Sequence, residues 1–189
     1  MEFQMGRRMS IVSACLALAL AVSGCGSSPA SSNAIAPTPT PPTSRYTATL
    51  SALNSSGVTG TVAMALSGDY MDVTISLAGL APNQQHMQHI HGAHGVRATC
   101  PTAASANADG VITLAAGTPA YGPVALPFEP TPTADASGKI TWSRTLRLLP
   151  DDIYNIKTLT DHVVLIHGMP YKGAYDQTLP VACGPIKAA

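Results

Sequence analysis

Charged and aromatic side chains are scarce in this sequence of 189 residues. Asp, Glu, Lys and Arg together make up 11% of the chain, aromatic residues make up 5%, and the acidic and basic side chains balance at 10 each. A chain without a basic stripe lacks the charge that binds phosphate backbones or anionic lipid headgroups. We therefore expect no nucleic acid partner.

Long hydrophobic runs are also lacking, apart from one near the N-terminus at 11–22. A membrane-spanning helix needs about 20 apolar residues, and this run is too short for one. Two arginines precede the run, and a Ser-Gly-Cys sequence that ends at Cys25 follows it. This order is typical of a secretory signal peptide, so we expect residues 1–24 to be removed.

The Ser-Gly-Cys sequence resembles the lipobox of bacterial lipoproteins, in which the cysteine receives a diacylglycerol and becomes the new N-terminus. The resemblance implies that Cys25 is lipidated and anchors the chain to the membrane of a bacterial envelope. The domain behind it would then face the periplasm or the cell surface. Ordinary cleavage nearby, with an unmodified Cys25, is the alternative.

Residues 25–44 hold no aromatic residue and consist mainly of Ser, Pro, Thr and Ala. Such a composition cannot bury enough apolar surface to offset the cost of ordering the chain, which predicts a tether between the lipid and the domain. The remainder, 45–189, has the length of one domain.

Alternation of apolar and polar side chains predicts that this domain is all-β. The clearest case is 70–78, where every second residue is a large apolar one, as expected for a strand with one buried face. Two segments rich in Thr, Val and Ala predict a hairpin from 46–53 and 60–67. Alternation predicts a further strand at 139–148, and an apolar run between two histidines predicts one at 162–167.

No stretch of the domain keeps a helical period over about 12 residues. Residues 100–139 are mostly Ala, Pro, Gly, Thr and Asp, which predicts a long loop with a short strand at 120–124. The expected architecture is a Greek-key β-sandwich or flattened barrel.

Two thiols remain in the exported domain, Cys100 and Cys183, because Cys15 leaves with the signal peptide and Cys25 is lipidated. An oxidising compartment favours a disulfide between them. Closing a loop of about 80 residues would stabilise the fold by about 4 kcal/mol through the unfolded chain. Two buried free thiols are the alternative.

All six histidines fall in two short segments, 86–94 and 162–167. On a strand, His89 and His91 share one face and can bind a single metal ion. His167 ends an apolar strand and would complete a site of three imidazole nitrogens, which suits copper or zinc. Two surface histidines without a metal are the alternative interpretation.

The sequence gives less reason to expect His94 or His162 to be metal ligands. His94 lies three residues beyond His91 in a glycine-flanked loop, where it is a possible extra ligand or simply an exposed side chain. His162 differs in parity from His167, so we expect it to face the other way and to be structural.

Several segments together resemble the copper,zinc superoxide dismutases, in order and near their spacing. They are Leu-Ala-Gly-Leu-Ala-Pro at 77–82, His-Met-Gln-His-Ile-His-Gly at 86–92, Cys100, Val-Val-Leu-Ile-His at 163–167 and Ala-Cys-Gly-Pro-Ile at 182–186. The first half, 46–92, also resembles the chordin-type (CHRD) domains, which are thought to be relatives of the same fold.

The resemblance implies copper ligands at His89, His91 and His167. It also implies that His86 braces the copper site from behind, and that Cys100 and Cys183 form the family's disulfide. The implied partners are the membrane, through Cys25, and superoxide or a copper ion.

The departures from the family are equally specific. No histidine occurs at 95–161, so the zinc ligands and the histidine that bridges the two metals are absent, and zinc is not expected. Pro180 stands where the family has the arginine that guides superoxide, and Arg97 and Lys172 are the substitutes by sequence position. Three functions are therefore open. The chain is a copper-dependent superoxide dismutase, a catalytically silent binding or structural module, or a periplasmic copper carrier.

Overall fold

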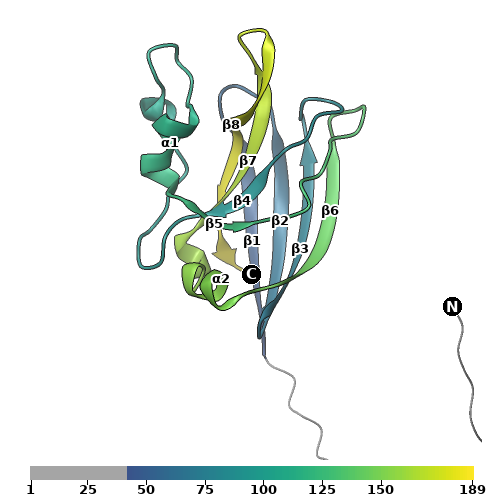
Figure 1. Cartoon of the computed structure of the whole chain (residues 1–189), viewed down its shortest axis with the longest axis vertical. Coiled ribbons are helices and arrows are strands. Elements are labelled where there is room, and N and C mark those ends of the chain that lie inside the picture. Colours follow the sequence, from purple (N-terminus) through teal and green to yellow (C-terminus); the bar gives the residue numbers. More distant parts are fainter. Residues whose placement is uncertain (1–41) are drawn as a thin grey trace, which may run out of the picture. The chain divides into compact units, whose positions relative to one another are not determined.

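Strands dominate the computed structural model, which describes residues 42–189 (Figure 1). The expected signal peptide at 1–24, the lipidation site Cys25 and most of the tether at 25–44 lie outside the described residues. The last two residues of that expected tether, Thr43 and Ser44, already belong to the first strand. Within the described part, no helix is long and apolar enough to cross a membrane.

The nine described strands form one antiparallel sheet in the order β5-β4-β7-β8-β1-β2-β3-β6, with β9 paired to β1. The strands are β1 (Thr43–Ala52), β2 (Thr59–Ser67), β3 (Tyr70–Ala78), β4 (Gln88–His91), β5 (Val124–Pro127), β6 (Ile140–Arg147), β7 (Val163–Tyr171), β8 (Ala174–Pro185) and β9 (Lys187–Ala188). The predicted all-β class is confirmed, as are the hairpin of β1 and β2 and the strand at 70–78.

The long segment between Cys100 and β6 is more ordered than the sequence predicts. It holds a short 3-10 helix, η1 (Ala103–Ser105), and the helix α1 (Leu114–Tyr121). The expected strand at 120–124 is wrong, because α1 runs to Tyr121 and β5 begins at Val124. The buried side chain of Tyr121 holds α1 on the sheet. The sequence does not predict this helix, because it contains a glycine and a proline, which have low helix propensity.

A second unpredicted helix, α2 (Pro150–Asn155), is followed by the 3-10 helix η2 (Leu159–Asp161). Pro150 stands in the first turn, and the Asp152 carboxylate accepts a hydrogen bond from the backbone N–H of Leu149 at 2.8 Å. Both features favour a helix start, but six residues are too few to show a helical period.

The sheet curls around a main core that its inner face supplies (Figure 1). Met71, Val73 and Ile75 of β3 are fully buried in this core. Phe128, just after β5, stacks on Trp142 of β6 at 6.0 Å between ring centroids, which draws the two edges of the sheet together. A smaller cluster of Tyr121, Val163, Leu165 and Cys183 lies apart from this core, and the candidate site adjoins it.

Candidate metal centre

The antiparallel pairing of β4 with β7 sets the direction of the first two histidines. Ile90 is fully buried in the main core, so its neighbours His89 and His91 point to the other face of β4. His89 pairs with Leu165 and His91 with Val163, both of which belong to the smaller cluster. The outer face of the sheet therefore carries these two imidazoles.

His167 lies on the same face because it follows Val163 and Leu165 in the alternation of β7, and it stands at an irregularity in the pairing with β8. The register between β7 and β8 shifts on both sides of His167, and such bulges redirect side chains near functional sites. Gly168 follows with φ of 107°, and a Cβ there would collide with the hydroxyl of Tyr175. Glycine is required at this position if His167 is to keep its direction.

The three imidazoles converge on one point. A ring nitrogen from each of His89, His91 and His167 lies within 4.8 Å of the others. The ring centroids are 5.4 Å apart for His89 and His91, 5.3 Å for His89 and His167, and 5.6 Å for His91 and His167. The structure thus brings together the three histidines that the sequence singled out.

Backbone carbonyls fix the tautomers of two of these rings. Nδ1 of His91 donates to the carbonyl of Gly122 at 3.1 Å, and Nδ1 of His167 donates to the carbonyl of Thr178 at 2.9 Å. A neutral ring that donates from Nδ1 keeps a lone pair on Nε2. Those Nε2 atoms, and Nδ1 of His89, are buried with no hydrogen-bond partner.

Burial also keeps these imidazoles neutral. It lowers the pKa of His89 to about 4, helped by the nearby His91, and lowers the pKa of His167 to about 3. Burial lowers the pKa of His91 as well, although its bond to Gly122 opposes this shift. At neutral pH all three rings are therefore unprotonated, which is the form that binds a metal ion.

The three rings line a pocket of about 200 Å³. None of the residues described as lining it is charged, and the others are Met87, Leu114, Val124 and Thr178. Leu114 and Val124 are 45% and 47% exposed, so the apolar lining extends to the surface. A small molecule or ion can enter, but the lining offers no charge to attract it.

His86 contacts the backbone of His167. Its side chain is fully buried, and its ring nitrogens lie 3.0 Å from the carbonyl oxygen of His167 and 3.1 Å from that of Ala81. The hydroxyl of Tyr175 lies 3.3 Å from Nδ1 of the same ring. His86 therefore holds the backbone of His167 in place.

The other two histidines lie outside the group. The ring of His94 packs on Tyr154 of α2, with centroids 4.5 Å apart. His162 is 1% exposed, and its ring nitrogens lie 2.9 Å from the carbonyl oxygens of Thr158 and Asn155. His162 connects α2 to β7 and is structural in this fold.

The two cations considered as substitutes for a guiding arginine are engaged elsewhere. Arg97 forms an ion pair with Asp161 at 3.0 Å. Lys172 pairs with Asp109 at 2.8 Å, and neither cation is among the residues that line the pocket.

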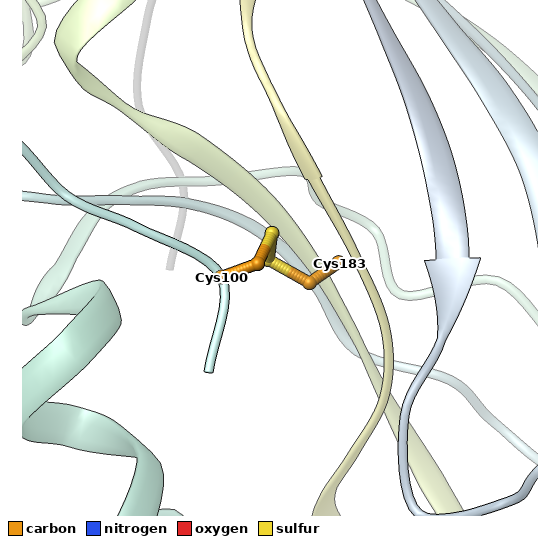
Figure 2. The surroundings of a disulfide bond; sticks show 2 residues. All are labelled: Cys100 and Cys183. Carbon is orange, nitrogen blue, oxygen red and sulfur yellow. A yellow bond between two sulfur atoms is a disulfide. The ribbon is translucent and has the colours of Figure 1, made fainter. Parts of the chain in front are cut away.

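A disulfide joins Cys100 to Cys183 (Figure 2). Cys183 belongs to the smaller cluster that the candidate site adjoins. Cys183 of β8 pairs with Leu165 of β7, which in turn pairs with His89 of β4. The bond therefore attaches the loop before α1 to the row of residues that carries the site. Free thiols, the alternative expectation, do not occur at these two positions.

Sequence reasoning missed three residues of the site. Tyr121 packs edge-on against the ring of His91 at 4.8 Å between centroids, and its hydroxyl donates to the carbonyl of Leu114 at 3.0 Å. Met87 and Thr178 line the pocket. Of the three, only Met87 could have been found from the sequence, because a residue two positions before His89 on a strand lies on the same face.

No protein-family model matches the chain, and no curated protein matches its sequence. Among solved structures, the chain is similar to superoxide dismutase 5 of Candida albicans in its Cu(II) form, with 12% identity and a TM-score of 0.49 over 78% of this chain and 94% of that one. A glutamate-to-alanine mutant of the same enzyme gives 12% identity and a TM-score of 0.48 over 77% of this chain and 89% of that one. Function has to be argued from the chain's own residues.

The lowered pKa values predict that the metal-free protein loses stability in mild acid. Between pH 6.5 and about 4, His89 and His167 bind protons in the unfolded chain but stay largely unprotonated in the folded protein. The free energy of unfolding therefore falls as the pH falls through this window. Urea unfolding of chelator-treated protein at pH 7.5 and pH 5 measures the loss. His89→Gln should make the loss smaller, and an equal loss in this variant would contradict the assignment.

Proposed function

We propose that this chain is an exported copper-binding protein whose metal ligands are His89, His91 and His167. The observation that supports the proposal is the convergence within 4.8 Å of three imidazoles, two buried and that of His89 half-buried, each with an unpartnered nitrogen. Leaving such nitrogens buried and unpartnered is costly, and a metal ion is the partner that satisfies all three together.

The donor set fits copper. Imidazole nitrogens suit copper and zinc, and three protein ligands leave an open position for a further ligand. The segments at 86–92 and 163–167 resemble the copper side of the superoxide dismutases, while the zinc ligands have no counterpart at 95–161. Copper is therefore the metal that we assign.

The surrounding residues would hold these ligands ready. The carbonyls of Gly122 and Thr178 orient His91 and His167, and His86 fixes the backbone of His167. Partners of this kind keep the ring direction and raise ligand basicity. Copper held there would supply one-electron redox chemistry.

Copper binding is tested on the purified full-length protein. We expect one equivalent of copper in the wild type, and a loss of affinity of at least about 10- to 100-fold in His89→Gln and His167→Gln, because each removes a donor. His94→Gln is the matched control and should keep the wild-type affinity. Competition titration and metal analysis measure both quantities.

A wild-type protein that takes up no copper would contradict the proposal. The chain would then be a silent binding or structural module. Full affinity in both His89→Gln and His167→Gln would show that copper binds elsewhere.

Superoxide dismutation is a second candidate function, favoured by the pocket that opens beside the three histidines. In this reaction one superoxide loses an electron and becomes dioxygen, while a second takes up that electron and two protons and becomes hydrogen peroxide. The uncharged lining gives no electrostatic guidance, and Arg97 and Lys172 are already paired. In such an environment we expect either slow dismutation of superoxide or copper carriage without turnover.

We expect copper-loaded protein to dismutate superoxide at least tenfold more slowly than the about 10⁸–10⁹ M⁻¹s⁻¹ of electrostatically steered association. The rate should also change little between about 0.01 M and 0.15 M salt, because none of the described residues that line the pocket is a Lys or Arg whose attraction salt could screen. Pulse radiolysis at the two salt concentrations measures both effects. A fast rate that salt suppresses would reveal guidance by a cation.

We also propose that lipid on Cys25 anchors the protein to a bacterial membrane, with residues 25–44 as the tether. The sequence around Cys25 supports this location, and the disulfide suits an oxidising compartment.

Expression in a bacterium tests the anchor by fractionation. Cys25→Ser should release the domain from the membrane fraction and remove the lipid mass measured by mass spectrometry. Cys15→Ser is the matched control, because Cys15 lies within the expected signal peptide and its loss should leave the protein membrane-bound. Membrane association of Cys25→Ser would argue against lipidation there.

A further inference from the structure

We propose that the thioether of Met87 is a fourth ligand beside the three histidines and makes the site selective for Cu(I). The inference rests on the copper binding proposed above and specifies its oxidation state. It assigns a role to a residue that the resemblance to superoxide dismutases leaves without one.

The backbone places Met87 on the same face as the histidines. The N–H of His167 donates to the carbonyl of Met87 at 2.9 Å, so the pairing of β4 with β7 continues one residue before β4 begins. The register that joins Gln88 to Ile166 then sets Met87 directly opposite His167. Residues opposite each other on one face have Cβ atoms about 4.5–5.5 Å apart.

The same alternation fixes the direction of the Met87 side chain. Gln88 and Ile90, at 1% and 0% exposed, point toward the inner side of the sheet, so Met87 and His89 point outward together. Met87 accordingly lines the pocket with His89 and His167. Its thioether thus has a histidine two residues along its own strand and another across the ladder.

The chemistry of this donor set favours Cu(I). A thioether is a soft ligand that selects Cu(I), whereas imidazole is acceptable to several metals. A long, unbranched side chain also lets the sulfur adjust to the ion.

The charge of the pocket points the same way. None of the described residues that line the pocket carries a carboxylate to offset the charge of a bound ion, so the ion keeps its full charge in a largely apolar site. Transfer of an ion from water to such a site costs more as its charge rises, which favours a monovalent ion over Cu(II) or Zn²⁺. The carboxylate of Asp176 does not line the pocket itself. It accepts a hydrogen bond at 2.7 Å from the hydroxyl of Thr178, which does.

Met87→Leu separates a ligand from a packing residue, because leucine keeps the size and apolar character and removes the sulfur. Met169→Leu is the matched control, since Met169 is also half-buried and lies on β7 but lines a different pocket. Both variants are compared with the wild-type full-length protein. Circular dichroism checks that each is folded.

Anaerobic competition with a Cu(I) chelator gives the Cu(I) affinity, and a separate titration gives the Cu(II) affinity. We expect Met87→Leu to weaken Cu(I) binding by about 10- to 100-fold and to change Cu(II) binding little, while Met169→Leu changes neither. X-ray absorption of the wild type with Cu(I) should show a sulfur neighbour besides nitrogen, and this sulfur should be missing in Met87→Leu.

The outcomes distinguish the two proposals. Cu(I) with nitrogen neighbours alone in the wild type, or unchanged Cu(I) affinity in Met87→Leu, overturns the role of Met87 and leaves the three-histidine site intact. Absence of copper binding in either oxidation state overturns the proposed function itself. The absorption spectrum of the wild type decides the point even if Met87→Leu does not fold.

Discussion

The antiparallel pairing of β4 with β7 is the interaction on which the candidate site depends. Its register places Leu165 opposite His89 and Val163 opposite His91, and its continuation to Met87 places His167 on the same face. A shift of one residue would move His89 and His91 into the main core and bring Ile90 outward. The same register anchors the core, because Ile90, Val164 and Ile166 fill its inner side. Fold and site are therefore specified together.

Partial burial then gives the three imidazoles their chemical character. The segment that carries α1 covers this face, and the disulfide from Cys100 to Cys183 attaches the start of that segment to β8. Tyr121 packs on His91, and the carbonyl of Gly122 binds the same ring. Loss of water contact lowers the pKa values of the histidines, so the nitrogens stay free for a metal instead of a proton.

The pocket also limits which chemistry is fast. The described lining holds no Lys or Arg that would attract an anion, whereas the imidazoles with the proposed thioether ligand would suit a soft, monovalent ion. The proposed copper binding therefore does not require rapid dismutation. A site that held Cu(I) firmly would suit the proposed carrier as well as a slow enzyme.

The sequence by itself determined the all-β class, the first hairpin and the strand at 70–78, the candidate ligands and the cysteine pair, because alternation, His-x-His spacing and cysteine number are local or countable features. It did not determine α1 and α2, whose short lengths leave no helical period. Nor did it reveal that the carbonyl of Thr178 binds His167 or that the ring of Tyr121 packs on His91. Both partners belong to other elements of the fold, and neither stands in a recognisable motif. Only the tertiary structure decided that His94 lies apart and that Met87 faces His167. Strand register and loop packing set these distances, and both depend on contacts between residues far apart in the chain.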